Sequence, residues 1–192
     1  MARRNVAFAP GEYYHVYNRG ANRDRIFRSD DNYRFLLERI KACTHDWQVG
    51  VVAYCLMPNH YHLILRQDGE RPIGGFMQAV FNSYTKAFNK MYERSGTLFE
   101  GPYRAILISD EAYVLHLCRY IHRNPVEAGL VERPEDWPYS NYLEWIGKRG
   151  GTLVDRDFVA ARFEQPEAYA RFVTEYVPPA HVQDSVRQLS FE

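Results

Sequence analysis

Long apolar runs, a disulfide framework and an excess of one charge are all missing from this sequence of 192 residues. No apolar run approaches the ~20 residues of a membrane-spanning helix, and the N-terminus lacks the long apolar stretch of a signal peptide. The three cysteines, Cys43, Cys55 and Cys118, show no CxxC spacing, which indicates reduced core residues of a cytoplasmic protein. These absences argue against a membrane protein and against a small secreted, disulfide-rich domain.

The net charge is zero, which at first argues against a nucleic-acid partner, but the charge is unevenly distributed. Residues 1–126 hold 17 Lys or Arg and 12 Asp or Glu, whereas residues 127–192 hold 7 and 12. Twenty of the 24 basic residues are arginines, whose planar guanidinium group suits phosphate and base-edge contacts. A cluster at Arg19, Arg23, Arg25 and Arg28, with Arg3 and Arg4 before it, is a candidate DNA surface, although most surface arginines are merely solvated.

Two histidines two residues apart form the most informative local pattern. Residues 51–65 are rich in β-branched and apolar residues and are interrupted at Met57-Pro58-Asn59, which predicts two strands around a turn. Successive side chains of a strand alternate between faces, so His60 and His62 share one face and Tyr61 points to the core. Two imidazoles on one face form half of a metal site, but two half-buried structural histidines would give the same pattern.

A second cluster, Tyr120-Ile121-His122-Arg123-Asn124-Pro125, closes a segment with an apolar stripe at helical spacing. At roughly 100° per residue, Tyr120 and Asn124 lie about 40° apart on the edge of that stripe. Pro125 disfavours helical geometry at the residue before it, which predicts that Asn124 ends the helix. Tyr120 is therefore a candidate reactive group, and the alternative is a tyrosine at the edge of the core.

The order of expected elements indicates an α+β fold. We expect strands at 13–19, 49–57, 60–66 and 103–108, and helices at 30–45, 72–93 and 110–123. This order is compatible with an antiparallel sheet covered by helices mainly on one face, followed by short helices after Gly129. We place a domain at 1–131 and an acidic, mostly helical extension packed on it at 132–192.

Four segments resemble the REP-associated tyrosine transposases, relatives of the single-tyrosine HUH transposases of bacterial insertion sequences. They are Ala-Tyr-Cys-Leu-Met-Pro-Asn-His-Tyr-His-Leu-Ile-Leu (53–65), Ser-Tyr-Thr-Lys-Ala-Phe-Asn (83–89), Gly-Thr-Leu-Phe-Glu-Gly-Pro-Tyr-Arg-Ala-Ile-Leu (96–107) and Arg-Tyr-Ile-His-Arg-Asn-Pro-Val-Glu-Ala-Gly-Leu-Val (119–131). Residues 13–20 also resemble the first strand of that family. The resemblance runs in order from about residue 13 to 131. Pro102 departs from it, because relatives commonly carry a basic residue there.

The resemblance implies a ferredoxin-like or RNA-recognition-like sheet and chemistry on single-stranded or hairpin DNA, with REP palindromes as the substrate in bacterial genomes. It assigns His60 and His62 to the HUH motif, Tyr120 to the nucleophile and Asn124 to the third metal ligand. The implied cofactor is Mg²⁺ or Mn²⁺, whereas the two histidines alone could equally hold zinc. We expect a cytoplasmic protein that acts at the bacterial nucleoid and needs no membrane and no obligate protein partner. A monomer is preferred to a homodimer.

The chemistry follows from the residue types as well. A phenol with a pKa near ~10 is ionised in only roughly one molecule in a thousand at neutral pH, so it needs a divalent ion that polarises the scissile phosphate. Attack by Tyr120 would give a 5′-phosphotyrosine and a free 3′-hydroxyl, and the reverse attack would rejoin strands. A DNA-binding protein that has lost activity is one alternative, and a zinc hydrolase with a further acidic ligand or base is another.

Other residues of the sequence are weaker candidates for these roles. Tyr113 could be the nucleophile but lies roughly 10 Å farther from the Asn124 end of the helix. His116 could shuttle a proton, although a plain surface histidine is the preferred interpretation. His122 is expected to be structural, and His45 and His181 are expected at the surface. The acidic C-terminal segment could fold over the basic face and limit access to Tyr120, or could simply be a solvated surface. The residues expected to contact DNA are Arg4, Asn18, Arg19, Arg23, Arg25, Arg104 and Arg123.

Overall fold

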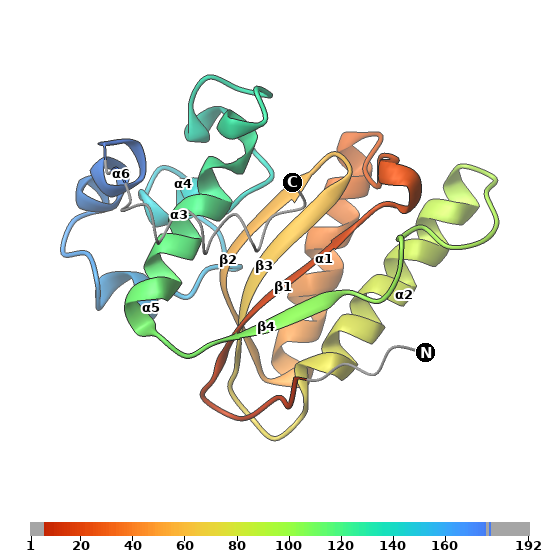
Figure 1. Ribbon diagram of the computed structural model, residues 1–192, viewed down its shortest axis with the longest axis horizontal. Coiled ribbons are helices and arrows are strands. Elements are labelled where there is room, and N and C mark those ends of the chain that lie inside the picture. The colour runs from red at the N-terminus through yellow and green to blue at the C-terminus, as the bar shows by residue number, and fades with distance from the viewer. Residues whose placement is uncertain (1–5, 176, 178–192) are drawn as a thin grey trace.

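The computed structural model describes residues 6–175 and 177 and places a four-stranded sheet at the centre of the molecule (Figure 1). The strands are β1 (Tyr13–Arg19), β2 (Val49–Met57), β3 (His60–Gln67) and β4 (Arg104–Ile108). They pair in the order β2-β3-β1-β4, and every pair is antiparallel. The α+β class and the antiparallel sheet are therefore confirmed, as is the expected order of elements from residue 13 to the Tyr120 helix.

Two long helices, α1 (Asp30–Trp47) and α2 (Ile73–Met91), cover one face of the sheet (Figure 1). A capping box at Ser29 and Asn32 starts α1, and Asp30 and Asp31 lie in its first turn, where the helix dipole favours anions. The buried side chains of α1 follow helical spacing, and together with those of α2 they contact Tyr61, Leu63 and Leu65 of β3. Tyr61 is buried as expected and stacks on Phe81 with ring centroids 4.4 Å apart.

The opposite face is also covered, whereas we expected helices mainly on one side. Helix α3 (Glu111–Glu127) packs there through Val114, Leu117, Cys118 and Ile121. The remaining elements are η1 (Ala21–Arg23), η2 (Pro134–Asp136), α4 (Tyr142–Trp145), α5 (Arg156–Ala160) and α6 (Pro166–Glu175). Large buried side chains after residue 131, among them Tyr142, Trp145, Phe158 and Tyr169, complete this second core. Burial of these large aromatic side chains removes apolar surface from water, which stabilises the C-terminal helices on this second face.

The C-terminal part also attaches to the edge strand β2 through polar contacts. The ladder between β2 and β3 shifts register between Val51 and Ala53, which leaves the backbone of Val52 outside regular pairing. The Nδ2 atom of Asn141 and the indole nitrogen of Trp145 both donate to the Val52 carbonyl, at 3.0 and 3.1 Å. The bulge therefore turns its carbonyl to the C-terminal part, which satisfies it.

All three cysteines are buried free thiols, as expected. None of the helices within residues 6–175 is long and apolar enough to cross a membrane. The domain boundary at residue 131 stays a prediction. The proposed gating role of the C-terminal segment concerned residues 178–192, which lie outside the described part of the chain.

Candidate active site

The turn between β2 and β3 brings the two histidines to the face that carries α3. Met57 pairs with His60 across a two-residue turn, Pro58-Asn59, so β3 begins directly at His60. The rings of His60 and His62 lie 5.1 Å apart between centroids and nearly perpendicular, at 86°. Their expected position on one face of a strand is therefore confirmed as geometry, and their role as metal ligands stays a prediction.

Helix α3 places the side chains of Tyr120 and Asn124 in contact with this histidine pair. The ring of Tyr120 meets the ring of His62 edge to face, with centroids 5.9 Å apart and an angle of 82°. The Oδ1 atom of Asn124 lies 3.4 Å from Nε2 of His60. Side chains from β3 and from a helix about sixty residues later in the sequence thus meet at one point of the fold.

Asn124 does not end the helix, contrary to the expectation drawn from Pro125. Helix α3 continues to Glu127, and the amide of Ala128 still bonds the Asn124 carbonyl at 2.9 Å. Pro125 lacks only its own N–H, and its place in the last turn limits the loss to one helical bond. The helical backbone turns the Asn124 side chain toward β3, where it is buried.

Burial keeps the site neutral. The pKa of His60 is lowered to about 4, chiefly because the imidazole is removed from water; the bond to Asn124 opposes this shift and the nearby charge of Arg19 adds to it. The pKa of His62 lies well below its usual value, again mainly because of burial, with further lowering by His15 and His60. Neutral imidazoles are the form that binds metal ions.

The residues present fit a divalent cation. Two neutral imidazoles and an amide oxygen form a mixed nitrogen and oxygen donor set. The Asn124 amide turns its oxygen toward His60, while its Nδ2 atom is buried and has no hydrogen-bond partner among the described residues. This orientation places the amide oxygen where it could bind a cation, at the cost of a hydrogen bond from the amide nitrogen. Among residues 6–175 and 177 no group of three or more His, Cys, Asp or Glu side chains could hold a metal ion.

His15 is part of this site and was missed by the sequence reading. It is fully buried on β1, its Nε2 atom lies 2.9 Å from Nδ1 of His62, and burial lowers its pKa to about 3. Tyr17 stacks on it at 4.7 Å and pairs with His62 across the ladder. Alternation along β1 places His15 and Tyr17 on one face, but only the β1–β3 register reveals that this is the face of His62.

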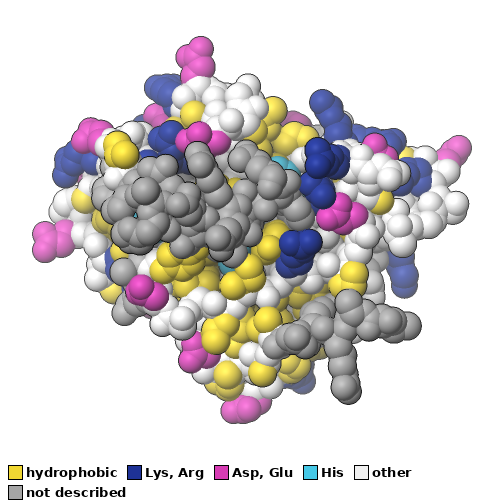
Figure 2. All heavy atoms as spheres, viewed as in Figure 1, with side chains coloured by type: hydrophobic (Ala, Val, Ile, Leu, Met, Phe, Trp, Pro, Cys, Tyr) yellow, Lys and Arg dark blue, Asp and Glu magenta, His cyan; other side chains and the backbone are white. Residues whose placement is uncertain are grey.

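The expected DNA-binding residues fall into three groups. Arg19 pairs with His60 across β1 and β3 and binds Glu100 at 2.9 Å, and the exposed Arg104 shares the His62 face because it pairs with Tyr17. Arg23 and Arg25 are exposed near the β2–β3 turn. Figure 2 shows basic side chains and a histidine side chain close together on the face that carries α3.

Asn18 and Arg123 lie elsewhere, and Arg4 lies outside the described residues. Asn18 is buried on the opposite side of β1, where its Nδ2 atom donates to the Gly101 carbonyl and its Oδ1 atom accepts from the Arg19 amide. Arg123 bonds Glu127 and the Val173 carbonyl in α6. Structural bonds therefore engage both side chains, and their contact with DNA stays an untested prediction.

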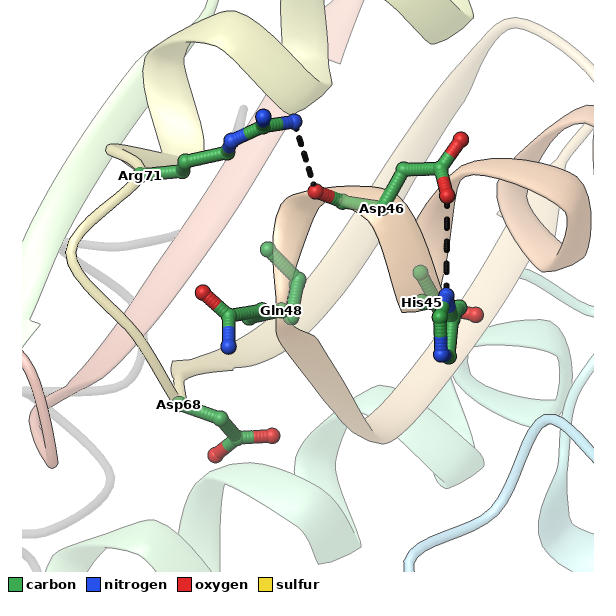
Figure 3. A pocket seen from close by; sticks show the side chains of 7 residues that line it. His45, Asp46, Gln48, Asp68 and Arg71 are labelled. Carbon is green, nitrogen blue, oxygen red and sulfur yellow. Dashed lines mark hydrogen bonds and ion pairs between the residues drawn. The ribbon is translucent and has the colours of Figure 1, made fainter.

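The other histidines and Tyr113 lie away from the His60–His62 pair or have structural contacts. His122 is buried and structural: its Nε2 atom faces Oδ1 of Asn141 at 2.9 Å and its Nδ1 atom faces the Tyr169 hydroxyl at 2.6 Å. Tyr113 lies two turns before Tyr120, partly buried in the second core, and burial raises its pKa. His45 is exposed at the rim of an open pocket at the opposite end of β3, with Asp46, Gln48, Asp68 and Arg71 (Figure 3). Seven residues of strand, roughly 23 Å, separate that pocket from His60.

Comparison with known proteins identifies the family. The sequence profile of the IS200-like transposases matches residues 10–124, more than half of the chain. The chain belongs to this transposase family. A protein of Haemophilus influenzae described as a REP-associated tyrosine transposase is 28% identical over 132 residues, which cover 63% of this chain and 74% of the relative.

A solved structure of a REP-associated tyrosine transposase bound to a REP hairpin has a similar fold, with a TM-score of 0.66 and 18% identity. The match covers 81% of this chain and 94% of that one. The resemblance first seen in four short segments is therefore confirmed over a larger part of the chain. The matched profile spans the histidine pair, Tyr120 and Asn124.

Proposed function

We propose that this chain is a metal-dependent DNA strand transferase that cleaves single-stranded DNA beside a REP-like hairpin through a covalent bond to Tyr120. The observation that carries the proposal is the meeting of four side chains in one chain: Tyr120 against His62, and Asn124 against His60. Family membership supports the reaction class. The hairpin bound to the structural relative supports the substrate class.

In this proposal Tyr120 is the nucleophile. Its oxygen loses the phenol proton and forms a bond to the phosphorus of the scissile phosphodiester. The bond from phosphorus to the 3′-oxygen breaks, and that oxygen takes up one proton and leaves as a 3′-hydroxyl, so no net proton is gained or lost. The DNA 5′ end stays on the enzyme as a phosphotyrosine. Because one phosphoester replaces another, a 3′-hydroxyl can attack the phosphotyrosine and rejoin strands without an energy source.

His60, His62 and Asn124 would hold the cation, with Mg²⁺ or Mn²⁺ as the proposed ion. A bound divalent cation would supply Lewis-acid polarisation of the scissile phosphate. All three ligands are neutral, so they add no negative charge beside the phosphate. The partial burial of Tyr120 beside them limits the movement of its ring, which favours a defined line of attack.

Arg19, Arg23, Arg25 and Arg104 are the proposed DNA contacts. Arg19 and Arg104 lie on the face of the histidine pair, while Arg23 and Arg25 lie in the loop that is bonded to its turn. A hairpin held by the loop would place its single-stranded flank over β3. On such DNA the protein would act in the cytoplasm, at the nucleoid.

The test uses the whole protein with REP-like hairpin oligonucleotides, with Mn²⁺ present or removed by chelation. We expect a protein–DNA adduct that resists denaturant, forms with wild type and the Tyr113→Phe variant, and is absent with Tyr120→Phe. An adduct with Tyr120→Phe would assign the nucleophile to another residue. Hairpin binding without any adduct would instead support the silent DNA-binding alternative.

A zinc hydrolase is not favoured by any observation. Such an enzyme would need an acidic ligand or base next to the histidines, and the described residues offer no cluster of three metal-binding side chains of that kind. Hydrolysis with water as the nucleophile would also leave no adduct. The same experiment therefore separates both alternatives from the proposal.

A further inference from the structure

Each imidazole of the pair is held through its Nδ1 atom by a neighbouring side chain. The Oδ1 atom of Asn59 lies 2.7 Å from Nδ1 of His60, and Nε2 of His15 lies 2.9 Å from Nδ1 of His62. One partner comes from the β2–β3 turn and the other from the middle of β1. A cation bound by His60 and His62 would therefore be held by their Nε2 atoms.

Asn59 decides which nitrogen of His60 carries the proton. Its Nδ2 atom donates to the Arg23 carbonyl at 3.3 Å, so its Oδ1 atom is the one that faces the imidazole. An amide oxygen can only accept a hydrogen bond. A neutral imidazole has a single N–H, and amide oxygens face both nitrogens of His60. The contact of Nδ1 with Asn59 at 2.7 Å is much shorter than that of Nε2 with Asn124 at 3.4 Å, which favours the proton on Nδ1 and the lone pair on Nε2. That nitrogen faces the Asn124 oxygen, and a second lone pair 3.4 Å away is the arrangement that a shared cation would stabilise.

The loop after β1 sets the orientation of Asn59. Asn22 and Arg23 adopt left-handed backbone angles, with φ of 56° and 62°, and this conformation turns the Arg23 carbonyl toward the turn. The loop is further bonded to the turn, because the amide of Gly20 donates to the Asn59 carbonyl at 2.8 Å. A Cβ atom at Gly20 would lie 2.1 Å from the Asp24 carbonyl oxygen, so this close turn requires glycine.

His15 contacts the Nδ1 atom of His62, as Asn59 contacts the Nδ1 atom of His60. Its ring stacks on that of His62 at 5.2 Å with an angle of 15°, and Tyr17 stacks on its ring as well. If His62 offers the Nε2 lone pair, its Nδ1–H donates to Nε2 of His15. His15 then carries its own proton on Nδ1, a buried atom that has no hydrogen-bond partner among residues 6–175. That unpaired N–H costs free energy, which a cation on Nε2 of His62 would offset in the proposed site.

We propose that Asn59 and His15 are positioning residues that hold His60 and His62 as Nδ1–H tautomers, so that both Nε2 lone pairs face a divalent cation. The inference rests on the proposed function for the presence of that cation. Hydrogen-bond partners of this kind behind metal-binding histidines commonly change metal affinity 10–100-fold. Asn59 also links this site to the loop that carries Arg23 and Arg25.

The test observes the tautomers directly in the metal-free protein. Selective ¹⁵N labelling of histidine and long-range ¹H–¹⁵N NMR near neutral pH distinguish the two ring nitrogens. We expect Nδ1–H for His60 and His62 in wild type. His122 provides an internal reference, since its Nε2 atom faces an Asn141 oxygen that accepts from the Tyr54 amide, which requires the opposite tautomer. An Nε2–H signal for His60 in wild type overturns the proposal whatever the variants do.

Variants then test the cause. Asn59→Leu removes the acceptor at nearly constant size, so we expect His60 to move toward the Nε2–H form and the Mn²⁺ dissociation constant, measured by electron paramagnetic resonance, to rise about 10–100-fold. Asn59→Asp keeps an acceptor oxygen and should keep the wild-type tautomer. For His62, His15→Phe should raise the dissociation constant, while His15→Gln, which retains an acceptor, should largely restore it.

Unchanged tautomers and Mn²⁺ affinity in Asn59→Leu, at a melting temperature close to that of wild type, would overturn the proposal for His60. Unchanged affinity in His15→Phe would overturn it for His62. Neither measurement uses DNA. A failed adduct experiment with the expected tautomers would therefore remove the strand-transfer function alone, and unexpected tautomers with a normal adduct would remove only the positioning role.

Discussion

At the scale of single residues, Asn124 is the side chain whose role is most open to a direct test. Its oxygen faces His60, and within the described part of the chain its buried Nδ2 atom has no hydrogen-bond partner, which is the orientation expected if the oxygen binds a ligand. Leucine has nearly the same size but no ligand atom. The chemical role of Asn124 can therefore be separated from its packing.

We predict that Asn124→Leu raises the Mn²⁺ concentration needed for half-maximal adduct formation at least about tenfold. Affinity for the hairpin with chelator present should stay within about twofold of wild type, because the arginines that would contact DNA are unchanged. The measurement is a Mn²⁺ titration of adduct yield beside a binding assay in chelator. An unchanged titration midpoint would remove Asn124 from the ligand set.

His122 offers a prediction about stability against pH. Burial lowers its pKa to about 4 in the folded protein, although the bond to Asn141 opposes the shift, whereas the unfolded chain has a pKa near ~6.5. The unfolded state thus binds more protons below about pH 6.5. The contribution of neutral His122 to the free energy of unfolding is therefore fully present above about pH 6.5 and is lost as the pH falls toward about 4.

Near pH ~5 the free energy of unfolding of wild type should therefore fall more steeply than that of His122→Gln, by up to about 1.4 kcal/mol per pH unit. Urea unfolding over this range provides the measurement. His45→Gln is the control, because the His45 side chain is 98% exposed, and its slope should follow wild type. Parallel curves for wild type and His122→Gln would show that His122 is not kept neutral by burial.

At the scale of elements, helix α3 is held from two sides. Its apolar stripe lies on the sheet, and its polar side is bonded to the C-terminal part through His122, Arg119 and Arg123. Arg119 and Arg123 donate to the carbonyls of Phe172 and Val173, which lie in the last turn of α6. The rotation of α3 about its axis, and with it the direction of Tyr120, is set by these contacts.

Asn141 is the centre of this attachment. Its amide accepts from the Tyr54 backbone and donates to the Val52 carbonyl of the bulged strand, and it also meets His122. We predict that Asn141→Leu lowers the free energy of unfolding by about 3 kcal/mol, because several buried polar groups lose their partner at once. Denaturant unfolding checks this, with Asn82→Leu on the exposed side of α2 as the matched control expected within about 0.5 kcal/mol.

At the scale of the whole molecule, residues on both sides of position 131 share the second core. Trp145, Tyr169 and Val173 are buried against β2 and α3. We predict that a chain ending at residue 131 does not unfold cooperatively and binds a hydrophobic dye, because it exposes this apolar surface. Calorimetry and dye fluorescence beside the full chain provide the measurement. A cooperative transition close to that of the full chain would support residues 1–131 as an independent domain.

The candidate site is built from side chains of a single chain. We predict that mixing Tyr120→Phe with His62→Ala does not restore adduct formation, since neither chain holds a complete set of residues. The yield should stay at the level of the separate variants over a wide range of protein concentration. Restored adduct in the mixture would instead indicate that two copies exchange Tyr120 between their sites.

Much of this architecture follows from local patterns. The strand bounds, the long helices and the common face of His60 and His62 depend on alternation, helical spacing and turn residues within short segments. Tyr120 and Asn124 could be picked from their spacing and from the family resemblance. One wrong expectation, a helix end at Asn124, came from the local effect of one proline in a helix that contacts with the C-terminal part stabilise.

The amino-acid sequence by itself determined which elements form, which side chains share a strand or helix face, and which family the chain resembles, because neighbours along the chain carry that information. Only the tertiary structure decided that His15 stands behind His62, that Asn59 links His60 to the Arg23 loop, that Asn18 points away from the site, and that the C-terminal helices cover the second face. These contacts join residues 36 to more than 80 positions apart. Their formation depends on strand register and on packing of the whole core, which no local pattern encodes.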